Sequence, residues 1–179
     1  MSSDIKLLYD FITPQEEQEF KTELFDKYAD KCCKDRIAIR FGSLLPCNCG
    51  IVEREIIPEV VERLRNKLVS KGIIDFPDSI TCNMYPPGTI INPHIDDVKM
   101  CGPLVVILSL FADTTITFRD TKMMHTLRNP SLAEKEEIYF PARTLFILGG
   151  DKRYTWTHET KATTTFRASI VFKSKKQTD

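Results

Sequence analysis

The sequence predicts a mainly β protein with helices at its N-terminal end, in the α+β class. Two segments before Gly72 show helical patterns, and no comparable pattern follows that glycine. After it come short β-branched and aromatic runs that are separated by proline, glycine and aspartate, as is typical of strands. Because no helix separates these strands, we expect them to pair antiparallel in a sandwich or barrel.

The first expected helix begins at Thr13 and Pro14, which supply an N-cap and a proline at the first helical position, and Glu16 completes a capping box. Large side chains then follow at four-residue spacing: Phe20, Leu24 and Tyr28. The second helix is expected from near Pro58 to Gly72. Its apolar stripe consists of Ile57, Val60, Val61, Leu64 and Leu68.

Seven strands are expected after the second helix. They occupy residues 79–85, 104–111, 114–119, 138–140, 144–148, 154–158 and 166–173. Such a core has an open mouth in which a site can lie.

Length and composition favour one domain over residues 1–179. The chain has 179 residues, without an internal repeat or a linker-like run. No apolar run approaches the ~18 residues that cross a bilayer, and the start of the chain lacks the order of a signal peptide. We therefore expect an intracellular protein of the cytoplasm, the nucleus or both, without a membrane partner, and we expect a monomer.

Six cysteines in a chain without a secretion signal do not resemble a disulfide framework, so we interpret them as reduced thiols. Four of them, Cys32, Cys33, Cys47 and Cys49, invite a zinc hypothesis, but structural zinc sites favour C-x-x-C pairs. Lys plus Arg equals Asp plus Glu, 25 of each, so the net charge alone does not attract nucleic acid. The excess of basic residues in 143–179 allows either a basic face or a solvated tail.

His94, Asp96 and His158 form a candidate metal site. In an extended chain, residues two apart point to the same side, so His94 and Asp96 can bind one ion. His158, from a distant strand, completes two histidines and one carboxylate, the set that non-haem Fe(II) oxygenases use. A surface histidine beside an acid is the alternative explanation of His94 and Asp96.

A second cluster also alternates with a period of two. Asn83 and Tyr85 share one face of their strand, and Arg167, Ser169 and Lys173 share one face of the last long strand. Inward cations are costly to bury unless an anion neutralises them. A dicarboxylate would do so, with the arginine fork on one carboxylate, and a salt bridge to a protein carboxylate is the alternative.

Together these residues resemble the ordered motifs of the AlkB family of Fe(II)/2-oxoglutarate-dependent dioxygenases. The resemblance covers about residues 79–173. It rests on Asn83-x-Tyr85, Pro87-Gly88, His94-x-Asp96, Leu108-Ser109-Leu110, Phe118, Arg143 to Leu148, Arg153 to His158, and Arg167-x-Ser169-x-Val171-Phe172-Lys173. It implies a double-stranded β-helix, the jelly-roll fold of cupins, at residues 79–173, with residues 1–78 as helical support and substrate lid.

The resemblance also implies roles for these residues. His94, Asp96 and His158 would ligate Fe(II), while Asn83, Tyr85 and Arg167 would hold the cosubstrate 2-oxoglutarate. Ser169 and Lys173 stand where the family usually has asparagine and arginine, and lysine keeps the charge but loses the planar fork. We still assign both to the cosubstrate cluster, with substrate contact as the alternative for Lys173.

Three further residues are candidates for substrate contact. Arg36, Arg40 and the following Phe41-Gly42 resemble the start of the family's nucleotide-recognition lid, and Trp156 is placed to stack on a base. A tryptophan in a strand is also a common core residue, which is the alternative for Trp156.

The expected function is hydroxylation or oxidative demethylation of a modified base in RNA or DNA. Succinate and CO2 would be released, and formaldehyde would be released from an N-methyl group. The stretch from Ile57 to Asp78 is similar to the tRNA-modifying AlkB homologue, which favours RNA modification over DNA repair. A methyl-lysine demethylase acting on protein and a catalytically silent jelly-roll binding module are the alternatives.

Overall fold

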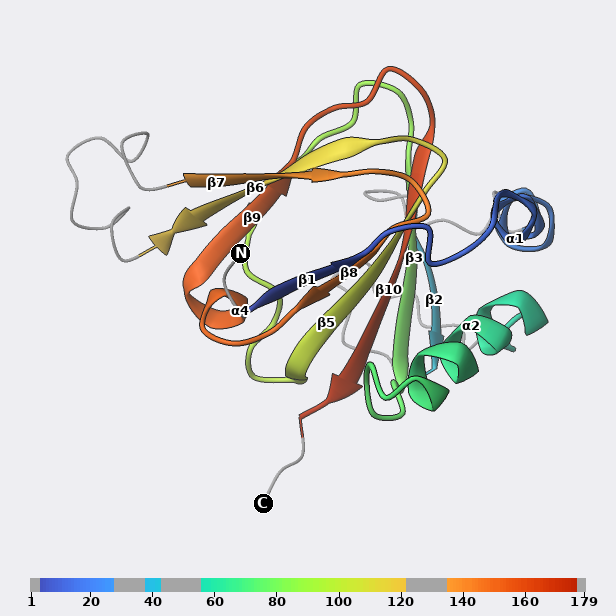
Figure 1. Ribbon diagram of the computed structural model, residues 1–179, viewed down its shortest axis with the longest axis horizontal. Helices are drawn as coiled ribbons and strands as arrows, with labels where there is room; N and C mark the ends of the chain where they lie inside the picture. Colours follow the sequence, from blue (N-terminus) through green and yellow to red (C-terminus); the bar gives the residue numbers. More distant parts are fainter. Residues whose placement is uncertain (1–3, 28–37, 43–55, 122–134, 177–179) are drawn as a thin grey trace.

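Two antiparallel sheets face each other in the computed structural model, which describes residues 4–27, 38–42, 56–121 and 135–176 (Figure 1). The larger sheet has the strand order β1-β8-β5-β10-β3-β2, and the smaller has the order β4-β9-β6-β7. The strands are β1 (Ile5–Leu8), β2 (Ala38–Gly42), β3 (Ser79–Tyr85), β4 (Ile91–His94), β5 (Cys101–Leu110), β6 (Thr114–Asp120), β7 (Lys135–Phe140), β8 (Leu145–Leu148), β9 (Trp156–Thr160) and β10 (Arg167–Lys175).

Three of the described helical segments precede most of the strands, and a fourth lies between β8 and β9. They are α1 (Pro14–Phe20), a π-helical turn η1 (Lys21–Phe25), α2 (Glu59–Ser70) and a single turn, α4 (Lys152–Thr155). The expected capping box is present, since Thr13 Oγ1 accepts from Glu16 N and Glu16 Oε2 accepts from Thr13 N. Tyr28, which was expected to extend the first helix, lies outside the described residues.

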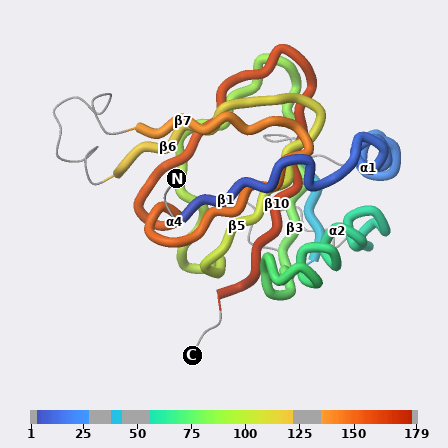
Figure 2. The backbone as a smooth tube through the Cα atoms, viewed as in Figure 1, coloured from blue at the N-terminus to red at the C-terminus, as the bar shows by residue number. Residues whose placement is uncertain are grey.

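The apolar side chains form one cluster on each side of the larger sheet. The cluster between the two sheets contains Phe118 and Phe146, whose rings stack with centroids 6.0 Å apart. The other cluster lies between the larger sheet and the helices, where α2 contributes Leu64 and Leu68. Figure 2 shows α1 and α2 on the side of the larger sheet that faces away from β6 and β7. The larger sheet is therefore the central layer.

The predicted α+β class and its antiparallel core are confirmed, and all seven expected strands are present. The structure adds β1, β2 and β4. It also corrects the strand expected at 154–158, because Tyr154 lies in α4 and the strand runs from Trp156 to Thr160.

Candidate metal and cosubstrate site

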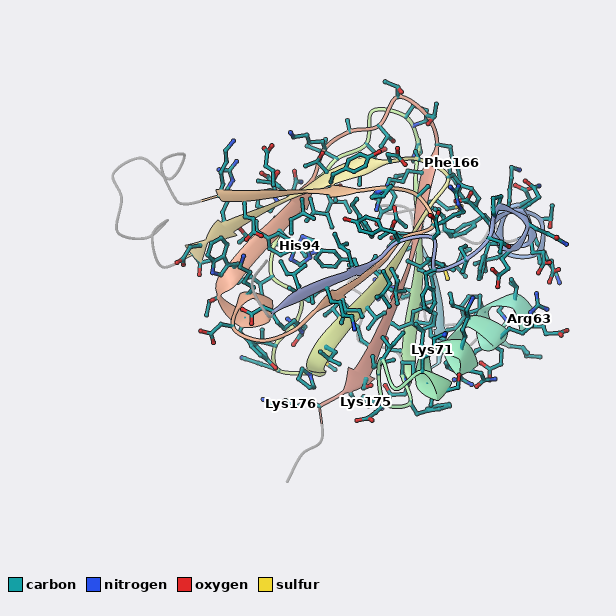
Figure 3. The ribbon with its side chains drawn as sticks, in the orientation of Figure 1. Arg63, Lys71, His94, Phe166, Lys175 and Lys176 are labelled. Carbon is teal, nitrogen blue, oxygen red and sulfur yellow. The ribbon has the colours of Figure 1, made fainter. Side chains whose placement is uncertain are left out.

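A cavity of about 660 Å³ lies between the two sheets and contains nearly all of the predicted site residues. The larger sheet contributes residues of β2, β3, β5 and β10, and the smaller sheet contributes residues of β4, β6, β7 and β9. Figure 3 shows His94 in the space between the sheets, whereas Arg63 and Lys71 lie on or beside α2, away from this space. A second cavity, of about 700 Å³, is lined by loops and contains none of the predicted residues.

His94, Asp96 and His158 meet at one side of this cavity. His94 ends β4 and is the register partner of His158 on β9, and their ring centroids are 4.3 Å apart. His158 Nε2 lies 3.7 Å from Asp96 Oδ2. One ligand atom from each of the three residues lies within 4.8 Å of the others. This spacing permits one ion to contact all three side chains.

The surroundings of the two imidazoles favour metal binding through Nε2. His94 Nδ1 lies 2.9 Å from the carbonyl oxygen of Asn92, so Nδ1 donates and Nε2 keeps its lone pair. His158 Nε2 faces Asp96, and burial, with a smaller contribution from His94, lowers the pKa of His158 to about 4. Its ring is therefore neutral at neutral pH, which is the form that ligates metals.

The two carboxylate oxygens of Asp96 have different neighbours. Lys173 Nζ lies 2.5 Å from Oδ1, while Oδ2 faces His158. Burial alone would raise the pKa of Asp96, but the Lys173 ammonium, together with His158, outweighs that effect and holds the pKa below its ordinary value. Asp96 is therefore ionised at neutral pH, with Oδ2 directed toward the histidines.

Arg167 is buried without an anionic partner among the described residues. Its side chain is 3% exposed, Nη2 contacts Ser109 Oγ at 3.5 Å, and its guanidinium carbon lies 4.9 Å from the centre of the Tyr85 ring. Nε has no hydrogen-bond partner in the described part of the chain, and burial lowers the pKa of the guanidinium. A buried, unneutralised fork that faces a cavity fits a bidentate carboxylate.

Three polar side chains lie next to Arg167 on the cavity wall. Tyr85 Oη is 3.1 Å from Ser169 Oγ, and Asn83 Nδ2 is 3.5 Å from the same oxygen. Antiparallel pairing of β3 with β10 sets Arg167 opposite Tyr85 and Ser169 opposite Asn83. The residues that follow each of these two on β10, Ala168 and Ile170, belong to the cluster under the helices. The alternation predicted for both strands is thus observed.

Lys173 faces the same cavity but has a different partner from the one expected. We assigned it to a dicarboxylate, and the structure pairs it with the protein carboxylate of Asp96. The salt-bridge alternative therefore holds for Lys173, whereas for Arg167 no protein carboxylate is paired with it in the described residues.

The three candidates for substrate contact have different outcomes in the structure. Arg40, on β2, lines the cavity. Arg36 lies outside the described residues, as do Cys32, Cys33, Cys47 and Cys49. Trp156 is not part of the cavity wall, since its ring packs against the cluster between the sheets and Lys152 Nζ lies 4.5 Å from its centre. Trp156 therefore packs with the core, as its alternative interpretation has it, and its stacking on a base stays a prediction.

Sequence reasoning missed one residue that contacts the site. Arg153 donates from Nη1 to the carbonyl oxygen of Asp96 at 3.0 Å and from Nη2 to that of Asp97 at 2.9 Å. The signal in the sequence was its place at the start of the motif from Arg153 to His158, to which no role was assigned.

Comparisons with known proteins identify relatives of this chain. No protein-family model matches it. It is 35% identical over 103 residues to an uncharacterised protein, L905, of Acanthamoeba polyphaga mimivirus, covering 57% of this chain and 45% of that protein. It is 26% identical over 161 residues to the tRNA (carboxymethyluridine(34)-5-O)-methyltransferase alkbh8 of Xenopus tropicalis, covering 85% of this chain and 24% of that one. A third relative, the mouse alpha-ketoglutarate-dependent dioxygenase alkB homolog 4, is 26% identical and is covered to 61%. The chain thus spans less than two thirds of each of these relatives.

Solved structures share the whole architecture. The structure of OsALKBH1 superimposes with a TM-score of 0.67 at 14% identity, covering 97% of this chain and 98% of that one. A prolyl-4-hydroxylase from Pseudomonas putida gives a TM-score of 0.61 at 11% identity, covering 98% and 95%. These matches confirm the expected jelly-roll fold.

Proposed function

The chain belongs to the AlkB family of 2-oxoglutarate-dependent dioxygenases, and on that premise we propose that it oxidises a modified base in RNA or DNA. The observation that carries the proposal is the convergence of His94, Asp96 and His158, beside a buried and unneutralised Arg167, on one cavity.

The residues present fit Fe(II) and 2-oxoglutarate. Two imidazoles and one carboxylate would hold the metal and leave its opposite side free. Arg167 would bind the distal carboxylate of 2-oxoglutarate, with Tyr85 beside it. When bound, the metal and the cosubstrate supply the oxidation of a C–H bond, with release of succinate and CO2.

The side chains of this protein hold and orient the reactants. Lys173 keeps Asp96 ionised and occupies Oδ1, so Oδ2 is the oxygen presented to a metal. The carbonyl of Asn92 fixes the His94 tautomer. Arg40 lies on the cavity wall formed by β2, where its charge suits a phosphate or the edge of a base.

RNA is the favoured substrate because the Xenopus relative is named as a tRNA methyltransferase. We also propose that residues 1–179 form one catalytic domain, since β1 and β2 from its first part complete the same sheet as β5, β8 and β10.

The test measures succinate formation by the purified protein with Fe(II) and 2-oxoglutarate, alone and with methylated RNA, DNA or lysine peptides. Wild type should consume 2-oxoglutarate and act best on an RNA. His94→Ala should lose turnover, while Arg63→Ala, on the outer side of α2, should keep it. A wild type that consumes no 2-oxoglutarate indicates a silent binding module, and turnover with peptides alone indicates a methyl-lysine demethylase.

Arg167→Met separates cosubstrate binding from catalysis. Hydrogen bonds to a charged group contribute roughly 1.5–3 kcal/mol, so the KM for 2-oxoglutarate should rise by about 10-fold to 100-fold. An unchanged KM would show that the buried guanidinium has only a structural role.

A further inference from the structure

Arg153 is a buried cation whose hydrogen bonds go to the backbone beside a proposed metal ligand. Its side chain is 1% exposed, and its two terminal nitrogens donate to the carbonyl oxygens of Asp96 and Asp97. Among the described residues, no carboxylate forms an ion pair with it, and its Nε has no partner. These two carbonyls are therefore its main compensation for burial.

A buried arginine without an ion-pair partner costs more free energy than an apolar side chain in the same place. A guanidinium loses its hydration when it is buried, whereas an apolar side chain of similar length fills the same volume without that cost. What an apolar side chain lacks is the rigid planar fork, which here spans two consecutive carbonyl groups. The fork fixes the path of the backbone at Asp96 and Asp97.

The backbone segment that Arg153 contacts lies outside the strand ladder. The ladder between β4 and β9 ends at His94, and residues 95–97 have no regular secondary structure. Backbone carbonyls outside a ladder need other donors when they are removed from water. Arg153 provides a donor to each of two consecutive carbonyls, those of Asp96 and Asp97.

The other end of the connection is the segment that carries His158. Arg153 lies in α4, which leads directly into β9. The start of α4 is anchored, since Lys152 N donates to Asp4 Oδ2 and Arg153 N to the carbonyl of Gly149. The Arg153 side chain thus adds a link, beyond the β4–β9 ladder, between the backbone at Asp96 and the segment that leads to His158.

We propose that Arg153 is a positioning residue that sets the place of Asp96 relative to His158. It acts through the backbone of Asp96, and its own side chain does not line the cavity. This inference rests on the proposed function, because it requires Asp96 and His158 to share a metal.

The experiment measures Co(II) binding to the metal-free full chain, by titration and by the ligand-field absorption of the bound ion. Arg153→Met keeps the length of the side chain and removes its donors, and Arg153→Lys keeps the charge without the fork. Arg65→Met is the matched control, since Arg65 is also a largely buried arginine, 11% exposed, but it pairs with Glu62 on α2. Melting temperatures are recorded for every variant.

Loss of partners that orient metal ligands typically weakens metal binding by roughly 10-fold to 100-fold. Arg153→Met should show such a loss and an altered Co(II) spectrum, and Arg153→Lys should fall between it and wild type. Arg65→Met should lower the melting temperature and leave Co(II) affinity and spectrum unchanged.

Three results would overturn the inference: wild-type affinity in folded Arg153→Met, wild-type affinity in Arg153→Lys, or an equal loss in Arg65→Met. If Arg153→Met does not fold, Arg153→Lys decides. A wild-type protein that binds no Co(II) would instead contradict the proposed metal site itself.

Discussion

Lys173 and Arg167 point into one cavity from one strand, yet they have different partners. The face that they share was predictable, because alternate residues of a strand lie on the same side. The partner of Lys173 was not, because Asp96 is 77 residues away in the chain and only the folded sheets bring the two together. Arg153 was missed for the same reason, since an arginine in a polar stretch looks like a surface residue until its carbonyl partners are known.

Lys173→Met should destabilise the metal-free protein more than the metal-bound one. Without the ammonium, the Asp96 carboxylate is buried with no salt-bridge partner, and breaking a buried pair costs about 3 kcal/mol or more. A divalent cation that binds at Asp96 restores positive charge beside it. Urea unfolding with and without Mn(II) measures the difference.

Lys173→Arg is the control for charge, and it should stay close to wild type in both conditions. Equal destabilisation of Lys173→Met with and without Mn(II) would contradict a metal position at Asp96.

His158 should make the stability of the metal-free protein depend on pH. Its pKa is about 4 in the folded protein, below the ordinary value of 6.5 for a histidine, so the unfolded chain takes up a proton first as the pH falls. Unfolding is therefore favoured increasingly between pH 6.5 and about 4, by up to about 3 kcal/mol. Urea unfolding at several pH values should show a shallower loss in this window for His158→Gln. If the free energies of unfolding of wild type and His158→Gln fell in parallel with pH, this role of His158 would be contradicted.

At the scale of elements, the strands that were predicted are those with a strong β-branched and aromatic pattern. β4 was missed because it contains Asn92 and Pro93, which disfavour strands, and its pairing depends on β9. Tyr154 has a high strand propensity, but it lies in α4, where its N–H donates to the carbonyl of Asp151. Tertiary contacts decide both cases, and a single sequence does not reveal them.

Gly42 ends β2 in a conformation that a side chain would not tolerate. Its φ is +78°, and an added Cβ would lie 2.3 Å from the carbonyl oxygen of Asp78. Gly42→Ala should therefore lower the free energy of unfolding by roughly 1–3 kcal/mol and loosen the strand that carries Arg40. Gly72→Ala is the control, because Gly72 also has a positive φ, +62°, with nothing near the added carbon. Urea unfolding should show a larger loss in the free energy of unfolding for Gly42→Ala than for Gly72→Ala. Equal losses would exclude a contribution from the clash with Asp78.

At the scale of the whole molecule, the outer strands of both sheets are short or charged. β1 and β4 have four residues each, β2 has five, and β7 begins with Lys135, Glu136 and Glu137. Such edges disfavour pairing with another chain. Among the described residues, no helix combines the length and the apolar composition that crossing a membrane requires.

We therefore expect a monomer, with a molar mass of 20.6 kDa by light scattering coupled to size exclusion. Glu137→Val removes a charge from the β7 edge, where Glu137 pairs with Lys135 and Lys161, and it should increase self-association. A stable wild-type dimer would show that another surface dominates.

The pairing of β10 fixes the distance between the two cations that this strand contributes to the site. It is paired on both sides, with β3 and with β5, so its length cannot change locally without moving two neighbours. One inserted residue between Arg167 and Lys173 would turn one of the two cations into the apolar layer under the helices. Two inserted residues would keep both cations in the cavity but separate them by a further ~7 Å. We therefore expect related proteins to carry their insertions in loops. We expect them to keep the six-residue interval from Arg167 to Lys173.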